Sequence, residues 1–285
     1  MKKFAVIGYP LSHTLSPAMH RYLLDAMHIK ATYVALSIDG GELSAIARQL
    51  RDGDLTGINV TLPYKTAIID FLDTLDDVAR LAGAVNCSMF RDGQLIGTNT
   101  DVAGIKWAFA SSQYEVAGKH TMVLGAGGAA RAAILAISQL GAASIALAGR
   151  KPDALKKLTD EFAGLDGMPP LTQQMVDENM SLSGYEMIVN ATPIGMWPAL
   201  DNSPIDTARL TAGQGVFDMI YRPEPTKLME AAAEVGCHTV SGLDMFIGQG
   251  LASFKFWFPE LEVDSAGLPA GIEVDDLRRH LRDSM

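Results

Sequence analysis

Short apolar runs alternate with amphipathic helical segments along most of the chain. The expected strands are at 4–8, 32–38 and 57–62, and the expected helices are at 17–27, at 41–50 and from Tyr64 onward. Alternation of this kind is typical of βα units, in which helices cover a mostly parallel sheet. The pattern therefore predicts an α/β fold.

The third expected strand carries alternating side chains and is followed by a lysine. Its apolar positions, which we expect in the core, are Ile58, Val60 and Leu62. Asn59 and Thr61 lie between them, Pro63 stops the strand, and Lys65 comes two residues later. Lys65 is either an ordinary surface charge or a reactive group held at a strand end.

Strand-like runs continue through the second half of the chain. Runs at 84–90 and 94–99 flank Asp92-Gly93, a dipeptide that predicts a hairpin. Further strands are expected at 121–125, 144–149, 185–192 and 215–220. The segments at 110–120 and 164–184 show the least pattern.

The chain has 285 residues, enough for two domains. The polar segment GTNTD ends at Asp101, where we place one boundary, and the other lies near Gly242. The segment at 242–258 is apolar on nearly every face and must be buried. We expect residues 1–100, completed by C-terminal helices at 243–285, to form one α/β domain with a mostly parallel sheet. Residues 101–242 are expected to form a second domain.

Composition and charge exclude several classes of protein. The net charge of -10 argues against binding to nucleic acid or to an anionic membrane surface. The apolar run at 129–149 is interrupted by Arg131, Gln139 and Gly141, so it fails as a membrane span. Two cysteines and six histidines without ligand spacing predict no disulfide framework and no metal site. The expected location is cytoplasmic.

A glycine-rich turn follows the strand expected at 121–125. Gly125, Gly127 and Ala130 form a G-x-G-x-x-G/A pattern between a strand and a helix. The first glycine permits a tight turn, the second lets the backbone approach a pyrophosphate, and the small third residue packs the helix closely. The helix N-terminus adds free N–H groups for the anion. This context predicts a dinucleotide site, and a glycine-rich turn without a ligand is the alternative.

The end of the next strand indicates which dinucleotide is bound. NAD-binding chains usually carry an acid about 20 residues past the fingerprint, for the ribose 2′-hydroxyl. Here Arg150 and Lys151 occupy that place, which favours the 2′-phosphate of NADP(H), although Asp153 lies close by. NAD(H) is the alternative cofactor, and a simple surface cap of the strand is the alternative without a ligand.

Hydroxyl side chains lie two residues apart at Ser12, Thr14 and Ser16, so in an extended segment they share a face. Ser16-Pro17 also resembles a helix N-cap followed by proline. These hydroxyls could hold a carboxylate, or the segment could be a capped turn alone.

Other polar side chains gather at the expected strand ends, where open α/β sheets build their sites. They are Asn59, Thr61, Asn86, Asn99, Thr100 and Asp101. Gln249 is an amide on an otherwise apolar helix, and a buried amide must find partners. That partner is either the backbone or a substrate hydroxyl.

Eight motifs in this order resemble the shikimate dehydrogenase family and span nearly the whole chain. They are SHTLSPAMH, NVTLPYK, LAGAVN, GTNTD, GAGGAAR, NAT-x-x-GM, DMIY and GLDMFIGQ. The resemblance implies reversible, NADP(H)-dependent reduction of 3-dehydroshikimate to shikimate, in the pathway to chorismate and the aromatic amino acids. It implies an α/β substrate domain at 1–100, completed by the C-terminal helices at 243–285, and a Rossmann NADP-binding domain at 101–242. It also implies a small-molecule substrate and a monomer or homodimer.

The resemblance also implies roles for individual residues. The catalytic pair would be Lys65 and Asp101. The substrate would contact Thr14, Ser16, Thr61, Lys65, Asn86, Asp101, Tyr221 and Gln249. The cofactor would contact Gly125, Ala126, Gly127, Gly128, Ala129, Arg150, Lys151, Asn190, Ala191, Thr192, Met219 and Gly242.

The chain departs from the family pattern at four positions. Thr14 stands where serine is usual, Gly149 where asparagine is common, and Ala154 where NADP-selective members often have a second arginine. Lys151 or Lys156 could compensate for that missing arginine. Asp244 replaces the second glycine of the final motif.

Three alternative functions are retained. The first is a quinate/shikimate dehydrogenase that accepts NAD, the second a regulator that binds NADP without turnover, and the third a folate dehydrogenase of similar plan. Lys65, Asp101, Asn86 and Gln249 together argue against a regulator, which needs no proton-handling pair. The hydroxyls at 12–16 suit a small carboxylate better than a pterin. Lys65 is expected to act either as a neutral base after desolvation or as a cation that polarises the developing oxyanion.

Overall fold

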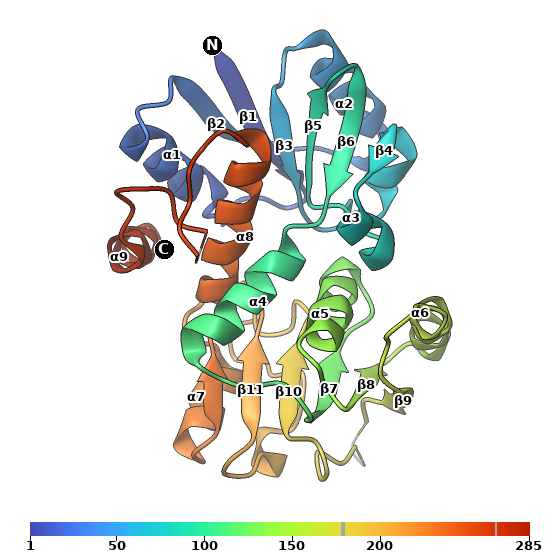
Figure 1. The fold of residues 1–285 in the computed structure, drawn as a ribbon. Helices are drawn as coiled ribbons and strands as arrows, with labels where there is room; N and C mark the ends of the chain where they lie inside the picture. Colours follow the sequence, from blue (N-terminus) through green and yellow to red (C-terminus); the bar gives the residue numbers. More distant parts are fainter. Residues whose placement is uncertain (178–179, 266) are drawn as a thin grey trace. The chain divides into compact units, whose positions relative to one another are not determined.

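A computed structural model describes residues 1–177, 180–265 and 267–285, and these form two compact units (Figure 1). Unit 1 comprises residues 1–100 and 247–285, and unit 2 comprises residues 101–246. The chain passes from one unit to the other after Thr100 and again within helix α8 (Gly242–Trp257).

Unit 1 contains a six-stranded sheet in the order β2-β1-β3-β5-β6-β4. Strand β1 pairs in parallel with β2 and β3, whereas β5 is antiparallel to both β3 and β6. The strands are β1 (Lys2–Gly8), β2 (Ala31–Ser37), β3 (Gly57–Val60), β4 (Thr74–Leu75), β5 (Cys87–Arg91) and β6 (Gln94–Thr98). The expected hairpin joins β5 to β6, with positive φ angles at Asp92 (53°) and Gly93 (80°).

Helices of unit 1 flank this sheet. They are α1 (Ser16–Ala26), α2 (Leu43–Asp52), α3 (Asp77–Ala82), α9 (Val274–Asp283) and the part of α8 from Ile247 onward, with short 3₁₀ helices at Gly40–Glu42 and Ala67–Phe71. Helix α8 lies against β1 and β3: the ring of Trp257 is 4.6 Å from that of Phe4, and a Cβ on Gly57 would come within 2.6 Å of the Trp257 indole nitrogen.

Three sequence-based expectations for unit 1 are wrong. Leu62 is not in the core but 53% exposed, because β3 ends at Val60 and the chain turns with a hydrogen bond of 3.0 Å from the Tyr9 N–H to the Leu62 carbonyl. The helical segment expected from Tyr64 is only the 3₁₀ helix that begins at Ala67. The C-terminal region is not helical throughout, since an isolated bridge joins Val263 and Pro269 between α8 and α9.

Unit 2 contains a six-stranded sheet that is parallel throughout, in the order β12-β11-β10-β7-β8-β9. The strands are β7 (His120–Leu124), β8 (Ser144–Gly149), β9 (Leu171–Met175), β10 (Met187–Asn190), β11 (Gly215–Asp218) and β12 (His238–Val240). Counted from β7, this is the 3-2-1-4-5-6 order of the Rossmann fold. The predicted α/β class is confirmed.

The helices of unit 2 are α4 (Asp101–Ser112), α5 (Gly128–Gln139), α6 (Pro152–Ala163) and α7 (Lys227–Glu234), with a 3₁₀ helix at Thr207–Arg209. Strand β9 lies in the segment 164–184, whose sequence shows little pattern. It is a polar edge strand, so it lacks the apolar run that marks a buried one. Within the described residues, no helix is both long and apolar enough to cross a membrane.

Candidate active site

The glycine loop of unit 2 has the geometry that its sequence predicts. Gly125 follows β7 with a φ of +115°, and a Cβ there would lie 3.1 Å from the Ala191 carbonyl oxygen. Gly127 is the N-cap of α5, and beyond its chain neighbours a Cβ at this position would meet no heavy atom of the described chain within 4 Å. Ala130 is fully buried beneath the helix start. The loop thus offers open backbone at a helix N-terminus, which fits a pyrophosphate group.

Two cations follow β8 at the same edge of the sheet. Arg150 and Lys151 are both exposed. Lys156, the other lysine considered for the 2′-phosphate, is instead paired with Asp160 at 2.6 Å along α6. A Cβ on Gly149 would approach Leu155 to 3.2 Å, so this packing favours a small residue before Arg150.

The ends of β10 and β11 are joined by side chains. Asn190 donates a hydrogen bond of 3.0 Å to Asp218, and its side-chain oxygen accepts bonds from the N–H (3.0 Å) and hydroxyl (2.7 Å) of Thr192. The Met219 N–H donates to the backbone carbonyl of Asn190 at 3.1 Å. Ala191 and Thr192, which follow β10, and Met219, which follows β11, therefore lie at the carboxyl edge where the glycine loop follows β7.

Asp218 is a fully buried carboxyl group that the sequence analysis did not select. It accepts hydrogen bonds from Asn190, from the Ile220 N–H (3.1 Å) and from the Thr226 hydroxyl (2.7 Å), which also caps α7. Burial raises the pKa of Asp218 to about 6, although all three hydrogen bonds oppose that rise.

In unit 1 the structure brings Thr14 and Ser16 together ahead of α1. The Thr14 hydroxyl donates to the Ser16 hydroxyl at 3.2 Å and accepts from the Ser16 N–H at 3.3 Å. The prediction of Ser16 as the N-cap is wrong, because Ser16 is the first helical residue and Leu15 precedes it without a side-chain cap. Thr14 thus has a structural role at the helix start through its two hydrogen bonds with Ser16.

Lys65 lies in the turn that follows β3. Its carbonyl oxygen accepts a hydrogen bond of 2.7 Å from the Val85 N–H, which places Lys65 beside the segment that carries Asn86. The preceding residue, Tyr64, is buried and donates its hydroxyl to the Ile38 carbonyl at 2.8 Å. Thr61 is half-buried at the end of β3, where a Cβ on Gly8 would come within 2.4 Å of its methyl group.

Asn86 is buried and held by Thr100. The Thr100 N–H donates to the Asn86 side-chain oxygen at 2.6 Å, and the Asn86 amide donates to the Thr100 hydroxyl at 2.9 Å. These two bonds fix which way the amide of Asn86 points. Asp101 follows Thr100 in sequence, begins α4 and is buried. Because Lys65 belongs to unit 1 and Asp101 to unit 2, their action as a pair stays a prediction.

The remaining predicted site residues lie in and before α8. Gly242 begins the helix, and a Cβ there would lie 2.2 Å from the Ile220 carbonyl oxygen. Asp244 lies in the first turn, where the helix dipole stabilises a negative charge. In unit 2 the ring of Tyr221 packs on that of Phe246 at 4.4 Å. Gln249 is half-buried within the part of α8 that belongs to unit 1.

Sequence reasoning also missed Ser253, which hydrogen-bonds Asn59 and Thr100. One signal was present, since Ser253 follows Gln249 by four residues and so shares its face of the helix. Asp218 had a weaker signal, a lone acid directly after an apolar strand.

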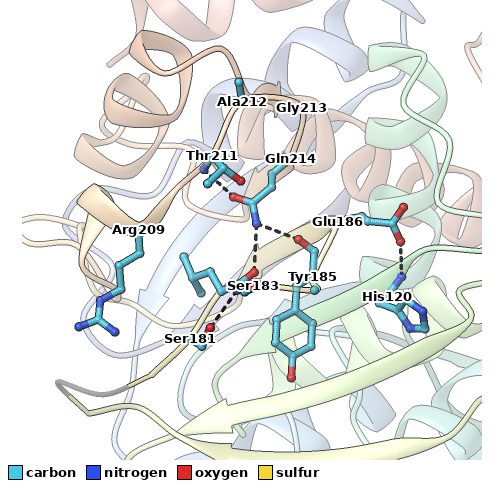
Figure 2. A pocket seen from close by; sticks show the side chains of 12 residues that line it. His120, Ser181, Ser183, Tyr185, Glu186, Arg209, Thr211, Ala212, Gly213 and Gln214 are labelled. Atoms are coloured by element: carbon cyan, nitrogen blue, oxygen red, sulfur yellow. Dashed lines mark hydrogen bonds between the residues drawn. The ribbon is translucent and has the colours of Figure 1, made fainter.

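A cavity of about 730 Å³ lies at the opposite edge of the unit 2 sheet (Figure 2). Its walls include His120, Glu186 and Gln214, which lie at the amino ends of β7, β10 and β11. Figure 2 shows that the Gln214 side chain forms hydrogen bonds with other residues of the cavity wall. It accepts from the Thr211 N–H and donates to the Tyr185 carbonyl, both at 2.8 Å. This cavity is therefore separate from the nucleotide loop. Across the described ranges, no three His, Cys, Asp or Glu side chains converge as metal ligands.

A Rossmann unit with an open glycine loop, in one chain with an α/β unit that has polar strand ends, defines the class of two-domain nicotinamide-dependent dehydrogenases. Comparison with known proteins gives the family. Residues 6–87 match the shikimate dehydrogenase substrate binding domain. The chain is 36% identical over 283 residues to the shikimate dehydrogenase (NADP(+)) of Moorella thermoacetica, covering 99% of this chain and 92% of the relative.

Two solved structures resemble this chain over its whole length. Shikimate 5-dehydrogenase from Thermus thermophilus, in complex with NADP(H) and shikimate, has a TM-score of 0.85 at 29% identity, with 100% of both chains covered. The ligand-free 5-ketofructose reductase of a Gluconobacter species (strain CHM43) has a TM-score of 0.84 at 28% identity, covering 100% of this chain and 99% of that one. The chain belongs to the shikimate dehydrogenase family.

Proposed function

We propose that this protein catalyses the reversible, NADP(H)-dependent reduction of 3-dehydroshikimate to shikimate, a step of aromatic amino acid biosynthesis. The observation that carries the proposal is the match to a shikimate dehydrogenase (NADP(+)) over 99% of the chain, which includes both units. A match of the nucleotide-binding unit alone would have left the substrate open.

Unit 1 supplies most of the groups that we propose for the substrate. The paired hydroxyls of Thr14 and Ser16 suit its carboxylate, and the fixed amide of Asn86 suits its ring hydroxyls. Thr61, Tyr221 and Gln249 belong to the same proposed set, which Lys65 and Asp101 complete. Apart from Lys65 and Asp101, these side chains are uncharged, so recognition of the ring hydroxyls would rest on directed hydrogen bonds, which reject analogues that lack a hydroxyl.

Unit 2 supplies the groups that we propose for the cofactor. Backbone from Gly125 to Ala129 would hold the pyrophosphate, and Arg150 with Lys151 would hold the 2′-phosphate. The segments at 190–192 and 219, with Gly242, would line the nicotinamide side. When bound, NADP(H) supplies the hydride, so the protein's own chemistry is to orient the substrate and to handle one proton.

We assign proton transfer to Lys65, with Asp101 as its partner. A protonated Lys65 is a competent acid for the reduction, and its charge would also stabilise a developing oxyanion. Asp101 begins α4, where the helix dipole favours a negative charge, and a carboxylate favours the charged form of a neighbouring lysine.

A two-by-two assay tests the proposed function: shikimate or quinate as substrate, with NADP⁺ or NAD⁺ as cofactor. The highest kcat/KM is expected for shikimate with NADP⁺. Higher kcat/KM for quinate with NAD⁺ would establish the quinate/shikimate alternative, and binding of NADP⁺ without turnover of either acid would indicate a regulator. An added arm with 5-ketofructose and NADPH tests the activity named for the Gluconobacter protein.

A monomeric or homodimeric assembly and a cytoplasmic location stay predictions.

A further inference from the structure

A chain of buried, uncharged polar side chains crosses unit 1. The Tyr33 hydroxyl donates to the Asn59 side-chain oxygen at 2.7 Å, and the Asn59 amide donates to the Ser253 hydroxyl at 2.9 Å. Ser253 and Thr100 hydroxyls are 2.9 Å apart, and Thr100 holds Asn86. The chain therefore runs from β2 through β3 and α8 to the residues around the proposed substrate site.

The five members of this chain of hydrogen bonds, Tyr33, Asn59, Ser253, Thr100 and Asn86, all have uncharged side chains. His20 stacks on Tyr33 with ring centroids 4.3 Å apart, and burial lowers the pKa of His20 to about 3. The imidazole is thus neutral at physiological pH. Any effect of changing a member of the chain must come from geometry and hydrogen bonding rather than from a lost charge.

Ser253 is the point at which α8 joins this chain. Its side chain is fully buried, and its oxygen accepts from Asn59 while it shares a hydrogen bond with Thr100. If the Ser253 hydroxyl donates to Thr100, then the Thr100 hydroxyl is free to donate to the Asn86 oxygen, 3.1 Å away. In that arrangement each of the three oxygens has a partner.

Helix α8 is also held by a close contact with α1 at Gly250, the residue after Gln249. A Cβ on Gly250 would come within 2.3 Å of the Met19 methyl group, so the helix backbone lies directly on α1. Ser253 holds the helix by its polar face, one turn beyond Gln249. Residues four apart lie above one another on a helix, so the position of Ser253 sets the direction in which Gln249 points.

We propose that Ser253 is a positioning residue for the substrate site, through its hydrogen bonds to Asn59 and Thr100. It sets the rotation of α8, and with it Gln249, and it completes the hydrogen bonding that orients Asn86. Ser253 acts through these residues and does not itself touch the substrate. This inference rests on the proposed function, because its readout is the affinity for shikimate.

The test compares Ser253→Ala with Ser88→Ala. Ser88 is an equally buried serine of unit 1 whose side-chain oxygen has no hydrogen-bond partner among the described residues, so the same change removes no hydrogen bond seen there. Ser253→Ala is expected to raise the KM for shikimate by about tenfold, the value of one lost hydrogen bond, with the KM for NADP⁺ unchanged. Calorimetric titration with shikimate in the absence of cofactor is expected to show the same loss of affinity, and Ser88→Ala is expected to match the wild type in both measurements.

A double-mutant cycle guards against an uninformative folding defect. Thr100→Val removes the hydroxyl that Ser253 contacts, and the effects of Thr100→Val and Ser253→Ala on the KM for shikimate are expected to be less than additive. Additive effects, or a Ser253→Ala protein with the wild-type KM and affinity for shikimate, would overturn the positioning role while leaving the proposed function intact. A wild-type protein that does not turn over shikimate would reject the proposed function, and the inference with it.

Discussion

The side-chain amide of Asn190 donates a hydrogen bond of 3.0 Å to the carboxyl group of Asp218, and it thereby joins the ends of β10 and β11. Both residues are fully buried, and Asn190 also accepts from Thr192. The segment proposed to line the nicotinamide side is thus fixed by a carboxyl group that carries a proton more readily than an ordinary aspartate.

The raised pKa of Asp218 predicts that its contribution to the free energy of unfolding depends on pH. Its pKa rises from 3.8 to about 6 on folding, so between these values the folded protein binds more protons than the unfolded chain. The contribution of Asp218 is therefore fully favourable below the unfolded pKa and is lost as the pH rises through the folded pKa. The loss is roughly 3 kcal/mol, since one pKa unit corresponds to about 1.4 kcal/mol.

Denaturant unfolding of Asp218→Asn and of the wild type at several pH values measures this effect. The free energy of unfolding of the wild type, relative to Asp218→Asn, is expected to fall between about pH 4 and pH 6. Asp166→Asn, which removes an exposed carboxylate from the same unit, is the control for overall charge. A constant difference between wild type and Asp218→Asn over this range would show that the carboxyl group titrates normally.

The sequence was most informative where a single local pattern determines the structure. The glycine loop, the β5–β6 hairpin and the buried strands of unit 2 each depend on neighbouring residues, so their positions were predictable. Leu62 was misplaced because alternation does not show where a strand ends. Strand β9 was missed because an edge strand with polar side chains carries no apolar run.

The polar networks could not be predicted, because their members are far apart in sequence. Asn59 and Ser253 are 194 positions apart, and Asn190 and Asp218 are 28 apart. Each of these side chains alone resembles an ordinary buried polar residue. Only the folded chain shows that their hydrogen bonds meet beside the proposed site residues.

Replacing Gly127 by alanine is expected to weaken the binding of NADP⁺ without lowering the stability of the protein. Apart from its chain neighbours, a Cβ at this position would meet no heavy atom of the described residues within 4 Å, and the φ of -93° suits alanine. Gly127→Ala is therefore expected to keep nearly the wild-type melting temperature but to raise the KM for NADP⁺ by about tenfold or more, because the methyl group occupies the space proposed for the pyrophosphate.

Gly242→Ala provides the contrast. Its Cβ would lie 2.2 Å from the Ile220 carbonyl oxygen, so this variant is expected to lose roughly 2 kcal/mol or more of stability. Thermal unfolding and cofactor titration of both variants separate the two causes. Equal destabilisation by both would mean that Gly127 serves the fold rather than the cofactor.

Lys65→Ala is expected to lower kcat by roughly 10² or more, because proton transfer loses its acid and base, with a smaller change in the KM for shikimate. Lys30→Ala, at an exposed position of unit 1, removes the same charge and is expected to leave kcat unchanged. Steady-state kinetics of both variants in the oxidative direction give the comparison. Turnover of Lys65→Ala near the wild-type rate would make Lys65 a structural residue.

Arg150 is proposed to contact the 2′-phosphate, and Lys156 is one of the two lysines that could compensate for the arginine absent at Ala154. Arg150 is exposed at the end of β8, whereas Lys156 is already paired with Asp160 at 2.6 Å. Arg150→Ala is expected to raise the KM for NADP⁺ by about ten- to a hundredfold, the range for a lost hydrogen bond to a charged group, and to leave the KM for NAD⁺ nearly unchanged. Lys156→Ala is expected to alter neither value, since its charge is neutralised along the helix.

If Arg150→Ala changes both KM values equally, Arg150 does not contact the 2′-phosphate. A selective rise in the NADP⁺ KM for Lys156→Ala would mean that this lysine leaves Asp160 to replace the arginine absent at Ala154.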